Sequence, residues 1–266
     1  MTGGQTAITD PELRATALDI ANTSLATVNE LRPSHIANLT QGQDIVFGLH
    51  IRCRYLFRGI CLLLDARLPQ EVSILSRTLL ADSVSLGYLR LNVGDLETLA
   101  LRFIRSSIHE ELALAYAARG AGGERLRAGV EELKDQQHRV ERDLLDRGVK
   151  PRSFPKLPAM LKAVEQESAY WNYKLGSMAV HTSRLALEAT RERGEDGVST
   201  WSDEGSDRSI ASLAHEATHA YVAGALAAAE IMGWPRMDEV LAFHESTISK
   251  LDALAVAAGW VGANAP

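Results

Sequence analysis

Apolar positions recur every three to four residues along most of the chain, which is the spacing of amphipathic helices. Glycine, proline and asparagine separate most of these segments, because these residues end helices or favour turns. The pattern predicts helices over residues 10–32, 44–67, 70–91, 95–119, 124–147, 159–165, 167–184, 208–232 and 237–258. We therefore expect an all-α fold, a bundle of about nine helices built on the antiparallel hairpin of residues 44–91.

The length of the chain is close to the upper size for one hydrophobic core, and we expect a single domain over residues 1–266. The alternative is a division into 1–148 and 159–266, joined by the basic, proline-containing segment between them. Residues 192–209 are rich in glycine, serine and charge and are predicted to form a mobile loop or hairpin, and the glycine-rich residues 120–123 a flexible joint. Acidic residues that stand before three of the predicted helices are predicted to cap them: Asp10, Asp95 and Asp207.

Composition narrows the class of protein. Aromatic residues make up only 6% of the chain, and alanine and leucine dominate many segments, which favours helix over strand. The net charge of -6 argues against a whole surface that binds nucleic acid, although a local basic pocket remains compatible with it. No apolar run approaches the roughly 18 residues of a membrane span. We expect a soluble, cytoplasmic protein with no cofactor and no membrane partner.

The two cysteines, Cys53 and Cys61, stand eight positions apart in one predicted helix. Their Cα atoms would then be about 12 Å apart, which is too far for a disulfide. We interpret them as small core residues of a protein in a reducing compartment.

Three polar side chains, Tyr173, Ser177 and His181, follow one another at intervals of four residues. One face of a helix then presents a phenol, a hydroxyl and an imidazole in a row. Such a row can bind a ligand or transfer protons, and it can equally form a hydrogen-bonded polar seam between helices.

Residues 51–88 contain an arginine-bearing helix, the turn Leu-Leu-Leu-Asp-Ala-Arg-Leu-Pro and the segment Leu-Ser-Arg-Thr-Leu-Leu-Ala-Asp-Ser. Together with the later Tyr-Lys-Leu-Gly-Ser-Met-Ala-Val-His, which ends at His181, they resemble the bacterial domain-of-unknown-function family 5677 over about residues 45–185. The family pattern Arg-x-x-x-Glu corresponds here to Arg77, but Ala81 replaces the glutamate. The resemblance implies a helical fold and a site at Arg77, Tyr173, Ser177 and His181, and no particular reaction.

The helical layout and the arginine and histidine signatures also resemble the HEPN superfamily, which includes metal-independent ribonucleases of defence and toxin systems. That resemblance implies an RNA or nucleotide ligand and a homodimer. His181 would exchange protons at the ribose hydroxyl, and Arg77 would stabilise charge on phosphate. The usual HEPN spacing of arginine before histidine occurs at Arg102 to His109 and at Arg208 to His215, as often as chance predicts, and involves neither candidate.

Arginines are concentrated in the central hairpin, where Arg54 and Arg58 share a helix face with apolar neighbours. A partly buried arginine needs an acidic partner or an anion. Pairing with Asp65, Asp82 or Glu71 is one interpretation. The other is a ligand-binding pocket for phosphate or carboxylate at Arg54 and Arg58, which a non-catalytic anion sensor or interaction module would use as well as an enzyme.

Residues 215–219 read His-Glu-Ala-Thr-His, the HExxH spacing with which two imidazoles hold zinc while the glutamate acts as a base. Under this second alternative, a zinc-dependent hydrolase, the metal ligands are His215, His219 and Glu239. The alanine-rich surroundings and the lack of a substrate-aligning strand upstream argue against it.

Overall fold

The computed structural model describes residues 8–34, 36–118, 124–170, 173–174, 191–193, 199–201 and 205–260. Within these residues the secondary structure is helical apart from one short hairpin of strands. The prediction of an all-α fold is confirmed. The α-helices are α1 (Asp10–Leu31), α2 (Gln41–Asp65), α3 (Pro69–Leu91), α4 (Leu96–Ala117), α5 (Glu124–Asp146), α6 (Leu157–Ala163), α9 (Asp207–Met232) and α10 (Met237–Ala257), with a 3-10 turn, η1 (Val93–Asp95), before α4.

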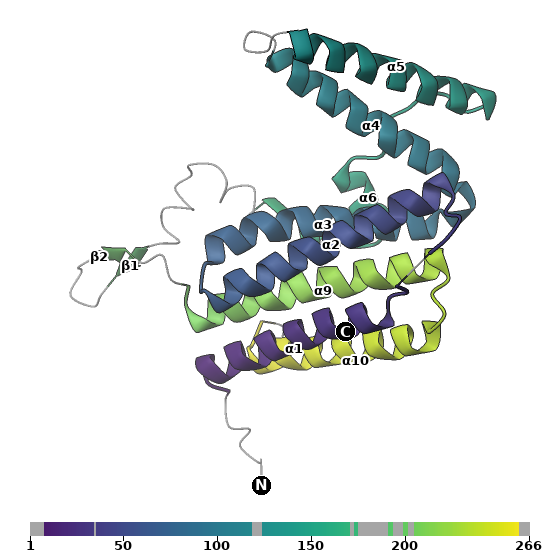
Figure 1. Ribbon diagram of the computed structural model, residues 1–266. Coiled ribbons are helices and arrows are strands. Elements are labelled where there is room, and N and C mark those ends of the chain that lie inside the picture. The colour runs from purple at the N-terminus through teal and green to yellow at the C-terminus, as the bar shows by residue number, and fades with distance from the viewer. Residues whose placement is uncertain are drawn as a thin grey trace.

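The helix α9 occupies the centre of the bundle. It contacts α2 and α3 on one side and α1 and α10 on the other (Figure 1). Small side chains make this possible, because most of its buried positions are alanine. The predicted α2–α3 hairpin is present, but the element that α1, α2, α3 and α10 all contact is α9.

Close packing joins α9 to the hairpin. Gly224 lies so near α3 that a Cβ atom there would be 2.9 Å from Ser83 Oγ. Further along, the ring of Tyr221 stacks on Phe57 of α2, with 4.3 Å between the ring centroids. The side of α9 that meets the hairpin therefore combines a close backbone approach to α3 with an aromatic contact to α2.

The helices α4 and α5 form an arm with a hydrophobic core of its own. In Figure 1 the arm projects from the bundle above α2 and α3. Its buried apolar residues come only from these two helices: Leu101, Ile108, Leu112, Val140 and Leu144. The narrow apolar stripe that the sequence shows over residues 124–147 is the face with which α5 covers α4.

A threonine or serine occupies the cap position before three helices, where the predictions of caps or helix starts differ from the structure. Thr9 precedes α1. Its backbone N–H and its hydroxyl donate hydrogen bonds to the carboxylate of Glu12, at 3.0 and 2.8 Å. Thr40 Oγ1 accepts a 3.2 Å hydrogen bond from the backbone of Gln43, so α2 begins three residues before the predicted start. The predicted cap at Asp10 is wrong, because Asp10 is already helical.

The predicted cap at Asp207 is also wrong. Ser206 caps α9, and its Oγ accepts a 3.2 Å hydrogen bond from the backbone N–H of Ser209. Asp207 is the first helical residue. Asp95 does occupy the cap position before α4, but its side chain forms no capping hydrogen bond.

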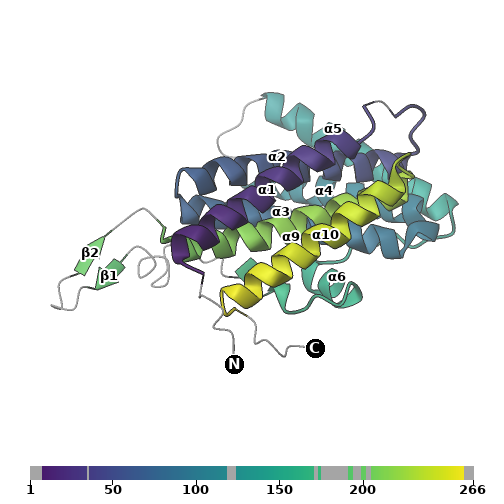
Figure 2. The same ribbon diagram turned by 90° about the horizontal axis from the view of Figure 1, so that it is seen from below.

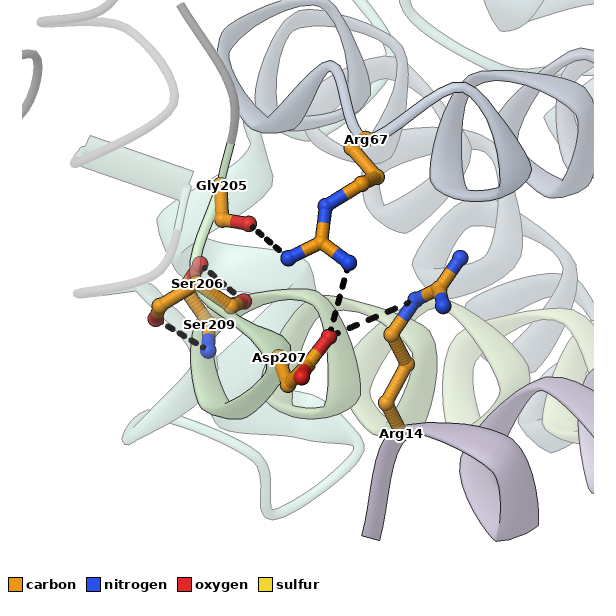
Figure 3. A network of polar contacts seen from close by, with 6 residues as sticks. All are labelled: Arg14, Arg67, Gly205, Ser206, Asp207 and Ser209. Atoms are coloured by element: carbon orange, nitrogen blue, oxygen red, sulfur yellow. Dashed lines mark hydrogen bonds and ion pairs between the residues drawn. The ribbon is translucent and has the colours of Figure 1, made fainter. Parts of the chain in front are cut away.

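Asp207 instead joins α9 to two other elements (Figure 3). Arg67, in the turn between α2 and α3, donates hydrogen bonds to the Asp207 carboxylate at 2.9 Å and to the Gly205 carbonyl at 3.0 Å. Arg14 Nε of α1 lies 3.8 Å from the same carboxylate oxygen. This network fixes the start of α9 against α1 and the hairpin turn.

The segment before α6 contacts the bundle through Phe154. The backbone N–H of this buried residue donates a 2.8 Å hydrogen bond to Ser106 Oγ, and its ring meets Tyr88 and Phe103 edge to face. The predicted linker is therefore held in place at this residue.

At the predicted loop 192–209 the structure has an antiparallel pair of strands, β1 (Arg191–Arg193) and β2 (Ser199–Trp201), which begins one residue before the loop and in which Arg191 is opposite Trp201. The predicted joint at 120–123 lies outside the described residues. Within the described part of the chain, no helix combines the length and the apolar character that a membrane span requires.

Candidate functional site

The candidate site is built on Arg77, in the middle of α3, and Tyr173, in the segment after α6. The Arg77 guanidinium donates a 3.0 Å hydrogen bond to the Tyr173 hydroxyl. Its central carbon also lies 4.6 Å from the centroid of the Tyr173 ring. The two predicted residues, 96 positions apart in the sequence, are thus in direct contact, and both remain partly exposed.

Two further residues, which sequence reasoning had not selected, extend this contact. The ring of Tyr170 stacks against that of Tyr173 with 6.0 Å between centroids and 11° between planes. The ammonium of Lys174 lies 5.3 Å from the Tyr170 centroid. The signal was available, because residues three and four apart on a helix are neighbours. We call Arg77, Tyr170, Tyr173 and Lys174 the aromatic–cationic cluster.

The other two residues of the predicted row, Ser177 and His181, lie outside the described residues. Their place beside Tyr173 stays a prediction from the helical spacing. The cluster can contribute guanidinium and ammonium donors and aromatic rings, while the imidazole predicted to transfer protons, that of His181, lies outside the described residues.

No carboxylate from α3 joins the cluster. Ala81 occupies the glutamate position of the family pattern, and the neighbouring Asp82 is buried against α2. There its carboxylate forms a 3.1 Å ion pair with Arg52. Burial raises the pKa of Asp82 to about 6, and the positive charge of Arg52 offsets part of that rise. One of the pairings predicted for the arginine-rich hairpin, with Asp82, is therefore present.

The two other predicted ligand-binding arginines are placed differently from Arg77. Arg54 Nε donates a short hydrogen bond to Asn29 Oδ1 of α1, and its guanidinium lies 5.7 Å from the Tyr55 centroid. Arg58 is exposed on α2. Arg54 thus belongs to the contact between α1 and α2, whereas Arg77 meets the segment after α6.

The residues of the HExxH segment do not gather around a common point with Glu239. The ring of His215 meets Trp260 edge to face at 5.5 Å, and burial lowers the pKa of both His215 and His219. Glu239 is bound to Arg236 at 2.5 Å on the surface. Among the residues that the structure describes, no group of three or more histidine, cysteine or acidic side chains is placed to hold a metal ion.

Another buried polar group, which the sequence did not single out, is His50 of α2. Neither of its ring nitrogens hydrogen-bonds to any described residue, and the ring meets Trp234 edge to face at 5.2 Å. Burial lowers its pKa to about 4, so the ring is neutral at physiological pH. The cysteines are likewise buried thiols without a disulfide, and burial raises the pKa of each to about 12.

Comparison with known proteins assigns the chain to a family. The model of the Family of unknown function (DUF5677) matches residues 43–198, which is more than half of the chain. The protein belongs to this family, as the motifs around Arg77 and His181 predict. No curated protein and no solved structure matches the chain. The match includes the aromatic–cationic cluster, while α1, α9 and α10 lie outside it.

Proposed function

We propose that the protein binds RNA or a nucleotide at the aromatic–cationic cluster and processes it by HEPN-like chemistry, in a defence or toxin-type role. The observation that supports this most directly is the contact of Arg77 with Tyr173, extended by the stacked ring of Tyr170. Arginine forms paired hydrogen bonds with phosphate, and tyrosine rings stack with bases.

The local charge of the cluster suits an anionic ligand even though the chain as a whole is acidic. Arg77 and Lys174 add two positive charges beside two aromatic rings. A guanidinium has five N–H donors, and the Tyr173 hydroxyl uses one of them. The remaining donors are sufficient for two oxygen atoms of a phosphate.

The proposed reaction needs a base as well as a binding group. His181 would accept the proton of a ribose 2′-hydroxyl, the ribose oxygen would attack phosphorus, and the 5′-oxygen of the next nucleotide would leave with a proton. Arg77 would stabilise the charge that develops on the phosphate oxygens, and Tyr173 and Ser177 would orient the reacting groups.

The alternative is a non-catalytic sensor that holds a small anion at the same place. The replacement of the family glutamate by Ala81, with Asp82 directed to Arg52, supports this alternative, because it removes any catalytic role that needs a carboxylate at that position. The zinc hydrolase has no comparable support, since Glu239 pairs with Arg236.

Binding of a fluorescent single-stranded RNA and of ATP tests the shared part of both proposals. We expect Arg77→Met to weaken binding by about ten- to a hundredfold, the equivalent of one charge-assisted hydrogen-bonded contact. Tyr173→Phe, which keeps the ring, should weaken it less. Arg142→Met, an exposed arginine on α5, is the matched control. Equal affinity of Arg77→Met and Arg142→Met would remove the cluster as the ligand site.

Turnover distinguishes the enzyme from the sensor. If the protein cleaves RNA, His181→Ala abolishes cleavage while bound RNA is retained. If it is a sensor, the unsubstituted protein binds the same probe without cleaving it, and His181→Ala changes only the affinity.

A further inference from the structure

A groove runs along the outer face of the bundle between α1 and α10. The two helices are antiparallel, because Arg208 pairs with Asp10 at one end of α1 and contacts Ala258 just after α10, while Arg236 pairs with Glu30 at the other end. Figure 2 shows this pair on the face away from α2 and α3. The groove has a volume of about 470 Å³, and no described element covers it.

The groove residues of α10 follow the spacing of a coiled-coil seam. Phe243, Thr247, Lys250, Leu254 and Ala257 succeed one another in steps of four, three, four and three residues. In a coiled coil such positions receive the side chains of a facing helix. Here Thr247 and Leu254 form the buried floor of the groove, while Lys250 and Ala257 are exposed at its rim, where a further helix could contact them.

The opposite wall, on α1, is made of small and polar side chains that would let a further helix approach: Thr16, Asp19 and Thr23, above Ile20. The floor includes Thr247, which is only 4% exposed.

Charge identifies what covers the groove. Asp19 on α1 and Lys250 on α10 both line it, both are exposed, and neither forms an ion pair with a described residue. A two-fold axis that runs along the groove, parallel to the helices, would lay α1 of each copy on α10 of the other and place each acid opposite the base of the second copy. One acid and one base on an otherwise apolar and hydroxyl-bearing face make that face complementary to itself.

The exposed apolar side chains on α2 lack this property. Tyr55 and Leu62 are each more than 60% exposed, but the charged residue between them is Arg58. A two-fold contact there would bring the positive charge of Arg58 near that of the same residue in the second copy. The α1–α10 face is therefore the better self-complementary surface.

We propose that the protein forms a two-fold dimer through the α1–α10 face, with Asp19 of one copy paired with Lys250 of the other. Helices of 22 and 21 residues are about 32 Å long, and a pair of them is about 20 Å wide. The footprint is then about 600 Å² per copy, somewhat below the roughly 800 Å² of a standard interface. The dimer is accordingly a reversible one that dissociates on dilution.

Charge reversal tests this pairing by sedimentation equilibrium or light scattering across a range of protein concentrations. Asp19→Lys and Lys250→Glu each place like charges in contact and should weaken the dimer by at least about a hundredfold. The double variant D19K/K250E reverses both partners and should restore it. Glu245→Lys, an exposed charge of α10 outside the groove, should leave it unchanged.

A second control examines the other exposed face. Leu62→Ser alters the apolar surface of α2 and should not affect association. A protein that is monomeric at every concentration overturns the proposal, as does a dimer that persists in D19K or dissociates in L62S. Because the substituted side chains are exposed, unchanged circular dichroism and thermal unfolding will show that each variant is folded.

Discussion

Glu216 shows how burial changes the chemistry of a single carboxyl group. It lies on the central helix α9, and burial raises its pKa to about 7. No described residue forms a hydrogen bond or an ion pair with it. Its ordinary pKa of about 4.5 applies in the unfolded chain, so the folded protein binds the proton more tightly. Folding is therefore favoured by the neutral acid and opposed by the carboxylate.

The pH dependence of this effect gives the first prediction. As the pH rises from about 4.5 through 7, Glu216 loses its proton in the folded protein. The contribution of the neutral acid to the free energy of unfolding is lost over the same range. Glu216→Gln should thus raise the free energy of unfolding by on the order of 2 kcal/mol at pH 8. At pH 4.5 the difference from the unsubstituted protein should be close to zero.

Chemical denaturation at both pH values measures the effect. The matched control is Glu245→Gln, an exposed glutamate on α10, for which we expect no change that depends on pH. A Glu216→Gln variant less stable at pH 8 than at pH 4.5, relative to the unsubstituted protein, would show that the carboxylate has a stabilising partner.

At this scale the sequence predicted one contact of the candidate site. The four-residue spacing and the family motif selected Arg77 and Tyr173, and the structure places them in contact. Tyr170 and Lys174 were missed, although Tyr170 stands three positions before Tyr173 and four before Lys174, which are the spacings of neighbours on a helix. The direction of Asp82 towards Arg52 was one of several pairings that the sequence allowed, because the relative rotation of α2 and α3 depends on packing.

At the scale of the helices, the α4–α5 arm is held together by a small core of five buried apolar residues. Leu144 is completely buried between the two helices, while its neighbour Leu145 is 58% exposed. Leu144→Ala removes apolar contacts and leaves a cavity, which typically costs about 2–4 kcal/mol. Because the arm has its own core, we expect the loss to be confined largely to α4 and α5.

Amide hydrogen exchange read by mass spectrometry resolves the two cores. In Leu144→Ala, peptides of α5 and of the outer half of α4 should exchange faster, and those of α9 should remain as protected as before. Leu145→Ala should behave like the unsubstituted protein. Equal acceleration in α9 and α5 would mean that the arm and the bundle unfold as one unit.

Helix existence was easier to predict than helix ends. The apolar periodicity located every helix that the structure describes, since it reflects which face is buried. The ends depended on local hydrogen bonds of Thr9, Thr40 and Ser206, which compete with the nearby acidic residues as caps. Sequence alone left that competition undecided.

For the whole molecule, the central position of α9 was not evident from periodicity. An alanine-rich helix has a weak apolar stripe, yet its small side chains are what let four long helices pack around it. The α2–α3 hairpin is more strongly apolar, and for this reason it was predicted to lie at the centre. Hydrophobicity identified buried faces, whereas the central place depended on side-chain volume.

The last prediction concerns the place where α9 comes nearest to α3. A Cβ atom at Gly224 would lie 2.9 Å from Ser83 Oγ and 3.3 Å from Ser83 Cα. In an open helix, glycine to alanine stabilises by up to about 1 kcal/mol, because alanine is the better helix former. At Gly224 the two helices would have to separate, and overpacking of this kind typically costs about 1–3 kcal/mol. We therefore expect Gly224→Ala to lower the free energy of unfolding of the whole bundle.

Two companion variants make the interpretation specific. Gly48→Ala is the matched control, because nothing lies within 4 Å of a Cβ atom at that position of α2, and it should be neutral or stabilising. Ser83→Gly removes the two nearest atoms that a Cβ at Gly224 would meet, Oγ at 2.9 Å and Cβ at 3.2 Å, so the double variant should recover part of the stability lost in the single one. Thermal and denaturant unfolding of the unsubstituted protein, Gly224→Ala, Ser83→Gly and the double variant gives the coupling free energy between the two positions. If Gly224→Ala stabilises the bundle as much as Gly48→Ala does, α3 and α9 are not in close contact there, and small side-chain volume is not what places α9 at the centre.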